Sequence, residues 1–176
     1  NEQRLSPALA VITNIIPDHL NRYKNFNSYQ RAKSFIFKYQ TKNDILFLNQ
    51  NDPVSRSIGE KQKIKSRIIW YNNDRTSLKT GHIHPDNIQA VLAVAKYLKL
   101  NKKNVQEAIK TFSTLNGRQE LVNTIKGVRY YNDTCATQPE AAIFAIKQIS
   151  KLLKQNSKLI LIAKRNKLNF VLDASN

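Results

Sequence analysis

Methionine is absent from this sequence, and cysteine occurs once, at Cys135. A single cysteine excludes an internal disulfide and is typical of a protein in the reducing cytoplasm. No signal peptide is present, and no apolar run reaches the ~18 residues of a membrane-spanning helix, so we expect a cytoplasmic protein without a membrane partner. Because the chain starts at Asn1 and has no methionine, we expect a fragment or a processed product.

Acidic residues are also scarce, with 12 Asp and Glu against 29 Lys and Arg and a net charge of +17. Such a charge attracts nucleic acid through its phosphates. The basic residues are scattered along the whole length, however, so a solvated basic surface is the favoured interpretation and no specific nucleic-acid site is expected. A basic α/β module that binds nucleic acid stays open as the alternative from another functional class.

Short apolar segments and amphipathic segments alternate along the first part of the chain. Continuous apolar runs indicate buried strands, and apolar residues at helical spacing indicate helices. The predicted strands are residues 8–15, 45–49 and 67–71. The predicted helices are residues 29–40 with Ser28 as cap, a short helix opened by Asp52-Pro53, residues 86–98 capped by Asp86, and a helix capped by Asn101.

The pattern changes after Phe112. Two strands at 120–125 and 128–131 are predicted to form a hairpin about Lys126-Gly127, followed by a helix at 140–153 and a strand at 159–163. Alternating strands and helices predict an α/β fold with a mainly parallel sheet and flanking helices. We expect a domain division that gives residues 1–113 and 114–176.

Polar residues follow the first predicted strand and its helix. Asp18 and His19 lie in a turn at the carboxyl end of that strand, where α/β folds place ligands. They can coordinate a divalent metal or hold a base, or they can merely satisfy the turn. Lys33 lies beside the apolar face of the next helix, where a lysine usually extends to water but can become nucleophilic toward carbon dioxide when partly buried.

A second group of polar residues precedes a helix in the middle of the chain. His82 and His84 lack a recognisable zinc-ligand spacing, so we do not expect zinc. The helix N-terminus that Asn87 helps to open is better suited to a nucleotide or another polar ligand.

A third group surrounds the predicted hairpin. Arg118 can reach a phosphate with its planar guanidinium or can remain a solvated surface group. The turn at 132–138 offers a carboxylate and hydroxyls, including Asp133 and Thr137, after a strand. Cys135 in this turn has no histidine nearby in the sequence, and we interpret it as inert.

Taken in order, these segments resemble the Mur ligases, and within them the branch that adds D-glutamate. The Asn-Asp-Thr-x-Ala-Thr segment at 132–137 is the form of that branch, whereas folylpolyglutamate synthases and other relatives usually carry segments such as Asp-Tyr-Ala-His. The resemblance is carried by Ser6-Pro7, 10–15, 17–23, Tyr29-x-x-Ala32-Lys33, 40–44, Gly81, Asn87, Gly117-Arg118-x-Glu120 and 132–137.

The resemblance implies that residues 1–113 are the later portion of a central ATPase domain and that residues 114–176 begin a Rossmann-like C-terminal domain. It implies ATP and Mg²⁺ as cofactors, UDP-N-acetylmuramoyl-L-alanine and D-glutamate as substrates, and a monomeric enzyme of peptidoglycan precursor synthesis. ATP would phosphorylate the substrate carboxylate, and the D-glutamate amine would attack the acyl phosphate.

The resemblance also implies roles for single residues. His19 matches a magnesium ligand, and Lys33 matches a lysine that is carbamylated in the family and assists metal binding. The remaining matches are Asn87, Arg118 and Asp133 for the nucleotide, and Thr137 and Lys167 for D-glutamate.

The sequence departs from the family pattern at four places, one of them Cys135, which replaces a lysine found in some members. Ile83-His84 replaces His-Asn, Gly117 replaces a usual histidine, and residues 163–167 replace a Gly-Gly-x-x-Lys loop. A Gly-x-x-x-x-Gly-Lys-Ser/Thr phosphate loop is absent. We therefore expect that loop and an N-terminal domain before Asn1, further chain beyond Asn176, and no ligase activity from this chain alone. Another Mur-type or folylpolyglutamate-like ligase, or a degenerate homologue, remains an alternative.

Overall fold

The computed structural model describes residues 4–18, 22–61, 63–72, 83–113, 115–153, 157–164 and 167–173. The chain separates into two compact units, Asn1–Lys110 and Thr111–Asn176. The division falls close to the one expected after residue 113. Within the described residues, no helix is long and apolar enough to cross a membrane.

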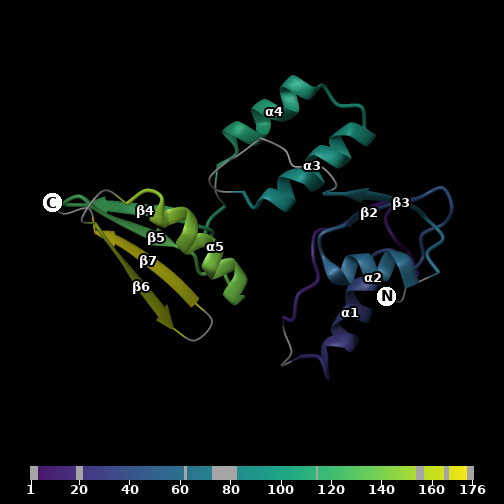
Figure 1. Ribbon diagram of the computed structural model, residues 1–176, viewed down its shortest axis with the longest axis horizontal. Helices are drawn as coiled ribbons and strands as arrows, with labels where there is room; N and C mark the ends of the chain where they lie inside the picture. Colours follow the sequence, from purple (N-terminus) through teal and green to yellow (C-terminus); the bar gives the residue numbers. More distant parts are fainter. Residues whose placement is uncertain are drawn as a thin grey trace. The chain divides into compact units, whose positions relative to one another are not determined.

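The first unit is built on a parallel sheet of three strands (Figure 1). Its strands are β1 (Leu9–Ile12), β2 (Ile45–Asn49) and β3 (Arg67–Tyr71), in the order β1-β2-β3. All five residues of the central strand β2 are buried, as the continuous apolar run predicts for a strand covered on both faces. The predicted strands at 45–49 and 67–71 are confirmed.

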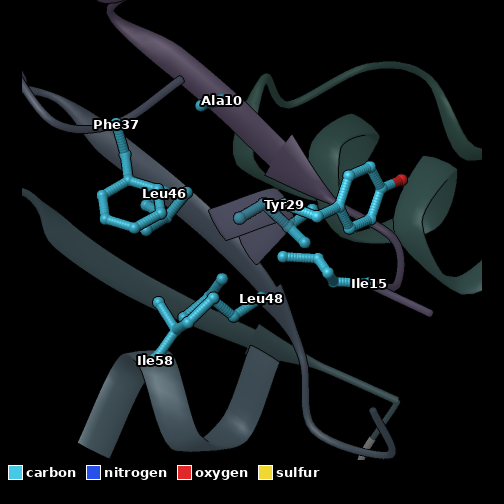
Figure 2. Close-up of a cluster of buried hydrophobic side chains, with 8 residues drawn as sticks. Ala10, Ile15, Tyr29, Phe37, Leu46, Leu48 and Ile58 are labelled. Atoms are coloured by element: carbon cyan, nitrogen blue, oxygen red, sulfur yellow. The ribbon is translucent and has the colours of Figure 1, made fainter. Parts of the chain in front are cut away.

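Helices cover both faces of this sheet. α1 (Phe26–Ser34) and α2 (Pro53–Lys61) lie on one face, and α3 (Pro85–Tyr97) lies on the other, followed by α4 (Lys102–Thr111). Successive side chains of a strand point to opposite faces. Leu46 and Leu48 therefore pack on the side of α1 and α2 (Figure 2), whereas Phe47 packs with Ala90 of α3.

The predicted helix at 29–40 was wrong at both ends. α1 begins three residues earlier than expected because Asn25 is the cap: its side chain accepts a hydrogen bond from the Ser28 N–H at 2.9 Å, and the Ser28 hydroxyl accepts one from the Asn25 N–H at 3.2 Å. Ser28 is thus the third residue of a capping box. The helix ends at Ser34 because the chain then turns and buries Phe37 in the core.

Two other boundaries also differ from the prediction. The first strand spans Leu9–Ile12, shorter than the expected 8–15. The cap of α3 is His84 rather than Asp86, and its Nδ1 accepts a hydrogen bond from the Asp86 N–H at 3.3 Å. The Asn101 cap of α4 is confirmed, since its side-chain oxygen accepts from the N–H of Lys103 at 2.9 Å.

The second unit contains a four-stranded sheet and one helix. Its strands are β4 (Glu120–Ile125), β5 (Val128–Asn132), β6 (Lys158–Lys164) and β7 (Lys167–Asp173), in the order β4-β5-β7-β6. Ala145 and Ile149 of α5 (Pro139–Ser150) pack against Tyr131 of β5. The hairpin is confirmed, and so is the helix, although it ends at Ser150 rather than at the predicted residue 153; β7 was not predicted.

The described strand pairs of this second sheet are all antiparallel, so the mainly parallel arrangement expected of the chain holds only for the first sheet. For the pair β4 and β5 the reason is local. A two-residue turn can only join antiparallel strands, and Lys126 and Gly127 both have the positive φ, 49° and 81°, that such hairpin turns need. The α/β class itself is confirmed.

Candidate functional site

The carboxyl edge of the parallel sheet brings together the segments that follow β1, β2 and β3. Asn49, the last residue of β2, is 1% exposed and lies at the centre of this edge. Its amide nitrogen donates to the Thr13 carbonyl at 2.8 Å and to the Asp86 carboxylate at 3.2 Å. Its amide oxygen accepts from the Asn51 N–H at 2.9 Å and from the Asn72 side chain at 2.8 Å. All four hydrogen-bonding positions of this amide are therefore used.

Asp52 anchors the loop that leads from β1 toward the candidate metal residues. It is buried, and one oxygen of its carboxylate accepts from the Ser55 N–H at 2.8 Å, from the Ser55 hydroxyl at 2.6 Å and from the Ile15 N–H at 3.3 Å. The carboxylate thereby caps α2, where the helix dipole favours a negative charge. The loop after β1 is held to the start of α2 through this single side chain.

Tyr71, at the end of β3, stabilises the same edge of the sheet through its hydroxyl. Its hydroxyl donates to the Ile12 carbonyl at 2.8 Å. Burial, together with the negative charges of Asp86 and Asp52, raises the pKa of Tyr71 well above its usual value. The phenol therefore stays neutral and acts as a fixed hydrogen-bond donor. Neither Asn49 nor Tyr71 was predicted from the sequence; the only hint was an asparagine closing an otherwise apolar strand.

Of the predicted residues in this unit, His19 lies outside the described residues. Lys33 is exposed in the last turn of α1, and its Nζ lies 5.1 Å from the centroid of the Tyr29 ring. Asn87 is exposed in the first turn of α3, next to the Asp86 that bonds Asn49. The pairing of His19 with Lys33 stays a prediction. Within the described ranges, no three or more His, Cys, Asp or Glu side chains are grouped to hold a metal.

In the second unit, the turn at 132–137 packs against the segment before β4. The Cys135 N–H donates to the Gly117 carbonyl at 2.9 Å. The Glu120 carboxylate accepts from the Gly117 N–H at 2.7 Å and from the Asn132 side chain at 3.1 Å. These bonds join the segment that carries Arg118 to the turn that carries Asp133.

Glycine is required at position 117 by its conformation and its surroundings. Gly117 has a φ of 74°, and a Cβ at this position would lie 3.0 Å from the Cys135 Sγ and 3.2 Å from the Thr134 hydroxyl. A side chain here would strain the backbone and collide with the turn. Glycine in place of the family's usual histidine therefore allows the segment before β4 to pack closely against the turn at 132–137.

Asp133 is 4% exposed, deeper than the sequence suggested for a residue in a ligand-facing turn. One of its carboxylate oxygens accepts from the Gln119 N–H at 3.0 Å, but the other is buried without a partner, as is the Gln119 side-chain oxygen. Burial raises the pKa of Asp133, and the Gln119 N–H and the Arg118 charge oppose that rise. The partnerless oxygen of this carboxyl can either carry a proton or accept a hydrogen bond from a ligand.

The remaining predicted residues lie around this turn or beyond it. Arg118 and Thr137 are exposed, and Cys135 is also exposed, with its Sγ 3.9 Å from the Asn116 carbonyl. The backbone of Lys167 begins β7 opposite Lys164, and its side chain lies outside the described part of the structure. The segments that carry Arg118 and Asp133 therefore pack together, and the assignment of Thr137 and Lys167 to D-glutamate stays a prediction.

The first unit is an α/β structure with a parallel sheet covered on both faces and polar groups at its carboxyl edge, the edge at which α/β folds place ligands. The model of the Mur ligase middle domain matches residues 2–128. The chain therefore belongs to the Mur ligase family.

Named relatives and solved structures agree with this assignment. UDP-N-acetylmuramoylalanine--D-glutamate ligase of Lachnoclostridium phytofermentans is 32% identical over 169 residues, covering 80% of this chain and 37% of that protein. The enzyme of the same name from Clostridium kluyveri is 33% identical over 170 residues, covering 84% and 37%. The chain thus spans less than two fifths of these relatives.

Solved structures share the fold, among them a MurF and a FolC. MurF from Acinetobacter baumannii matches with a TM-score of 0.64 and 16% identity, covering 86% of this chain and 38% of that one. E. coli FolC, in complex with DHPP and ADP, matches with a TM-score of 0.60 and 18% identity, covering 86% and 40%.

Proposed function

We propose that this chain forms part of an ATP-dependent ligase that joins D-glutamate to UDP-N-acetylmuramoyl-L-alanine in the cytoplasmic synthesis of peptidoglycan precursors. The observation that carries the proposal is the 32–33% identity, over at least 80% of the chain, to relatives named for that reaction. The Asn132–Thr137 segment supports the same branch. The whole enzyme would act as a monomer.

In the proposed reaction, a carboxylate oxygen of UDP-N-acetylmuramoyl-L-alanine attacks the γ-phosphorus of ATP, and ADP leaves. The D-glutamate amine then attacks the carbonyl carbon of the acyl phosphate, loses a proton, and inorganic phosphate leaves as the amide forms. Phosphoryl transfer of this kind depends on positioning and on neutralising the transferred charge. The residues of this chain would supply positioning.

We propose two nucleotide contacts in the second unit and one in the first unit. The exposed Arg118 guanidinium can bind phosphate oxygens through paired N–H donors. The unpartnered oxygen of Asp133 can accept a hydrogen bond from a nucleotide hydroxyl or amino group, which would satisfy an atom that is otherwise buried alone. Asn87, exposed at the start of α3, is proposed for the adenine.

Mg²⁺ binding is proposed for Lys33 and His19. Lys33 is exposed rather than partly buried, so its modification is proposed from the family resemblance alone; a carbamate there would provide the oxygen ligands that Mg²⁺ prefers. Asp52 and Asp86 are less suitable, because their carboxylates already accept hydrogen bonds from Ser55 and Asn49. The bound ion would neutralise charge on the transferred phosphoryl group.

D-glutamate binding is proposed for the end of the 132–137 turn. Thr137 is exposed just before α5, whose N-terminal N–H groups and helix dipole favour a carboxylate. Lys167 is proposed as a second contact to the amino acid. The Cys135 N–H of this turn bonds the Gly117 carbonyl, next to Arg118. The proposed contacts to D-glutamate and to the nucleotide would therefore lie on two segments that are bonded to each other.

A chimaeric enzyme tests the proposal. Residues 4–173 would replace the equivalent stretch of the Clostridium kluyveri relative, and ADP release would be measured with UDP-N-acetylmuramoyl-L-alanine and single amino acids. We expect release that depends on D-glutamate and falls at least tenfold in the Arg118→Gln variant. Lys102→Gln, an exposed change on α4, is the matched control. Release that depends on another amino acid instead would overturn the assignment to this branch.

A further inference from the structure

An open groove of about 520 Å³ runs alongside α1 and faces the segment that leads into β3. Its volume falls within the ~300–1,000 Å³ of small-molecule sites. The lining divides into an apolar part, formed by Phe35, Phe37 and Ile64, and a polar part. The polar part consists of Asn27, Gln30, Arg31, Ser34, Lys38, Lys63 and Lys65.

All the charges that line the groove are positive. Arg31, Lys38, Lys63 and Lys65 are exposed, and none of the lining residues is acidic. Within the described part of the chain, no carboxylate forms an ion pair with these four side chains. Like charges in a concave site repel one another and raise the local positive potential, so an anion that enters is attracted by several cations at once.

Parts of the groove are held in place before any ligand arrives. The Lys38 Nζ lies 4.5 Å from the centroid of the Phe35 ring and 5.4 Å from that of Tyr39, which restricts an otherwise flexible side chain. Phe37 is 7% exposed and packs in the core beside Leu46 (Figure 2), which fixes the wall to the sheet. Ordering these groups in advance lowers the entropic cost of binding.

We propose that this groove binds a phosphate-bearing small molecule, with its phosphate oxygens on Arg31, Lys38, Lys63 and Lys65 and its less polar part against Ile64 and the phenylalanines. A small molecule suits the groove better than a nucleic-acid strand, because the four cationic residues all line one hollow. A strand requires a basic track many nucleotides long.

The groove is distinct from the site proposed for the ligase reaction. Lys63 and Lys65 precede β3 and lie near the amino edge of the parallel sheet, whereas Asn49 and Asn72 lie at its carboxyl edge. The five residues of β3 separate these edges by roughly 16 Å at ~3.3 Å per residue. Lys33, the proposed metal residue, does not line the groove.

Titration of the isotope-labelled chain with inorganic pyrophosphate, followed by NMR at low salt, tests the proposal. We expect saturable chemical-shift changes in the amides of 30–38 and 63–65. The Lys63→Gln/Lys65→Gln double variant should bind pyrophosphate at least fivefold more weakly. Lys102→Gln/Lys103→Gln removes the same net charge from the exposed start of α4 and should change binding less than twofold.

Three results would overturn the proposal. Equal weakening in both double variants would show diffuse attraction to a basic surface. Loss of pyrophosphate binding in Arg118→Gln would assign the ion to the second unit. Tight binding of a single-stranded oligonucleotide that weakens equally in both double variants would identify a nucleic-acid track. All four substituted lysines are exposed, so we expect both double variants to fold. Circular dichroism of each variant checks this.

Discussion

The Asp133→Asn substitution tests the unusual environment of the buried carboxyl. It keeps the oxygen that accepts from the Gln119 N–H and replaces the partnerless oxygen by an N–H₂ donor. The Gln119 side-chain oxygen, which is also buried without a partner, is an acceptor of the kind that this new donor requires. Because an unpaired buried polar group costs about 1–3 kcal/mol, we expect the variant to be more stable by about 1 kcal/mol near neutral pH.

The pH dependence has a definite sign. Burial raises the pKa of Asp133 in the folded state, so the folded chain holds this proton more tightly than the unfolded chain does. The stability that Asp133 contributes is therefore fully present below its unfolded pKa and is lost as the pH rises through the folded pKa. An asparagine does not titrate, so the advantage of the variant should grow as the pH rises from the unfolded pKa of Asp133 through its raised folded pKa.

Thermal unfolding followed by circular dichroism measures the difference. A gain of 1 kcal/mol corresponds to a rise in Tm of about 4–8 °C for a unit of this size. Asp52→Asn is the matched control: one oxygen of the Asp52 carboxylate accepts three hydrogen bonds at the start of α2, so loss of its negative charge should destabilise by about 0.5–1 kcal/mol. The reasoning is refuted if Asp133→Asn destabilises at neutral pH, or if its effect is the same at all pH values.

Three further predictions concern other parts of the chain. Gly117→Ala should destabilise by about 1–3 kcal/mol in denaturant unfolding, because of its positive φ and the 3.0 Å approach to Cys135, whereas Gly127→Ala, with open space around its Cβ, should cost less. Asn49→Ala should lower the free energy of unfolding by about 2–4 kcal/mol, since several buried groups lose their partner. Lys33 should give a carbamate resonance with ¹³C-labelled bicarbonate that Lys33→Arg lacks; an unchanged spectrum in that variant would contradict the proposed modification.

The strands of the first sheet were predictable because burial on both faces leaves a simple pattern. Residues 45–49 are an unbroken apolar run closed by a polar residue, and the strand was predicted to the residue. α1 was misplaced because two signals competed: Ser28 is a good cap by itself, but Asn25 captures its N–H, and the helical spacing of apolar residues continues past Ser34 although the backbone turns there.

The site was less predictable than the fold because its contacts join residues that are far apart in sequence. Arg118 and Asp133 were chosen from a resemblance, and the structure joins their segments through Gly117, Cys135 and Gln119. Nothing in the local sequence of Asp133 indicates that one of its oxygens is buried alone. That property depends on how the two segments pack.

The Asn49 side chain bonds three segments at the carboxyl edge of the parallel sheet, and a ligand bound at this edge would contact them. The loop after β1, the residue after β3 and the start of α3 all bond this one amide, through Thr13, Asn72 and Asp86. A ligand that displaces one of these segments must either break a bond of a fully buried side chain or carry the other segments with it. Opening at this edge is therefore cooperative, and its amides should exchange with solvent together rather than one loop at a time.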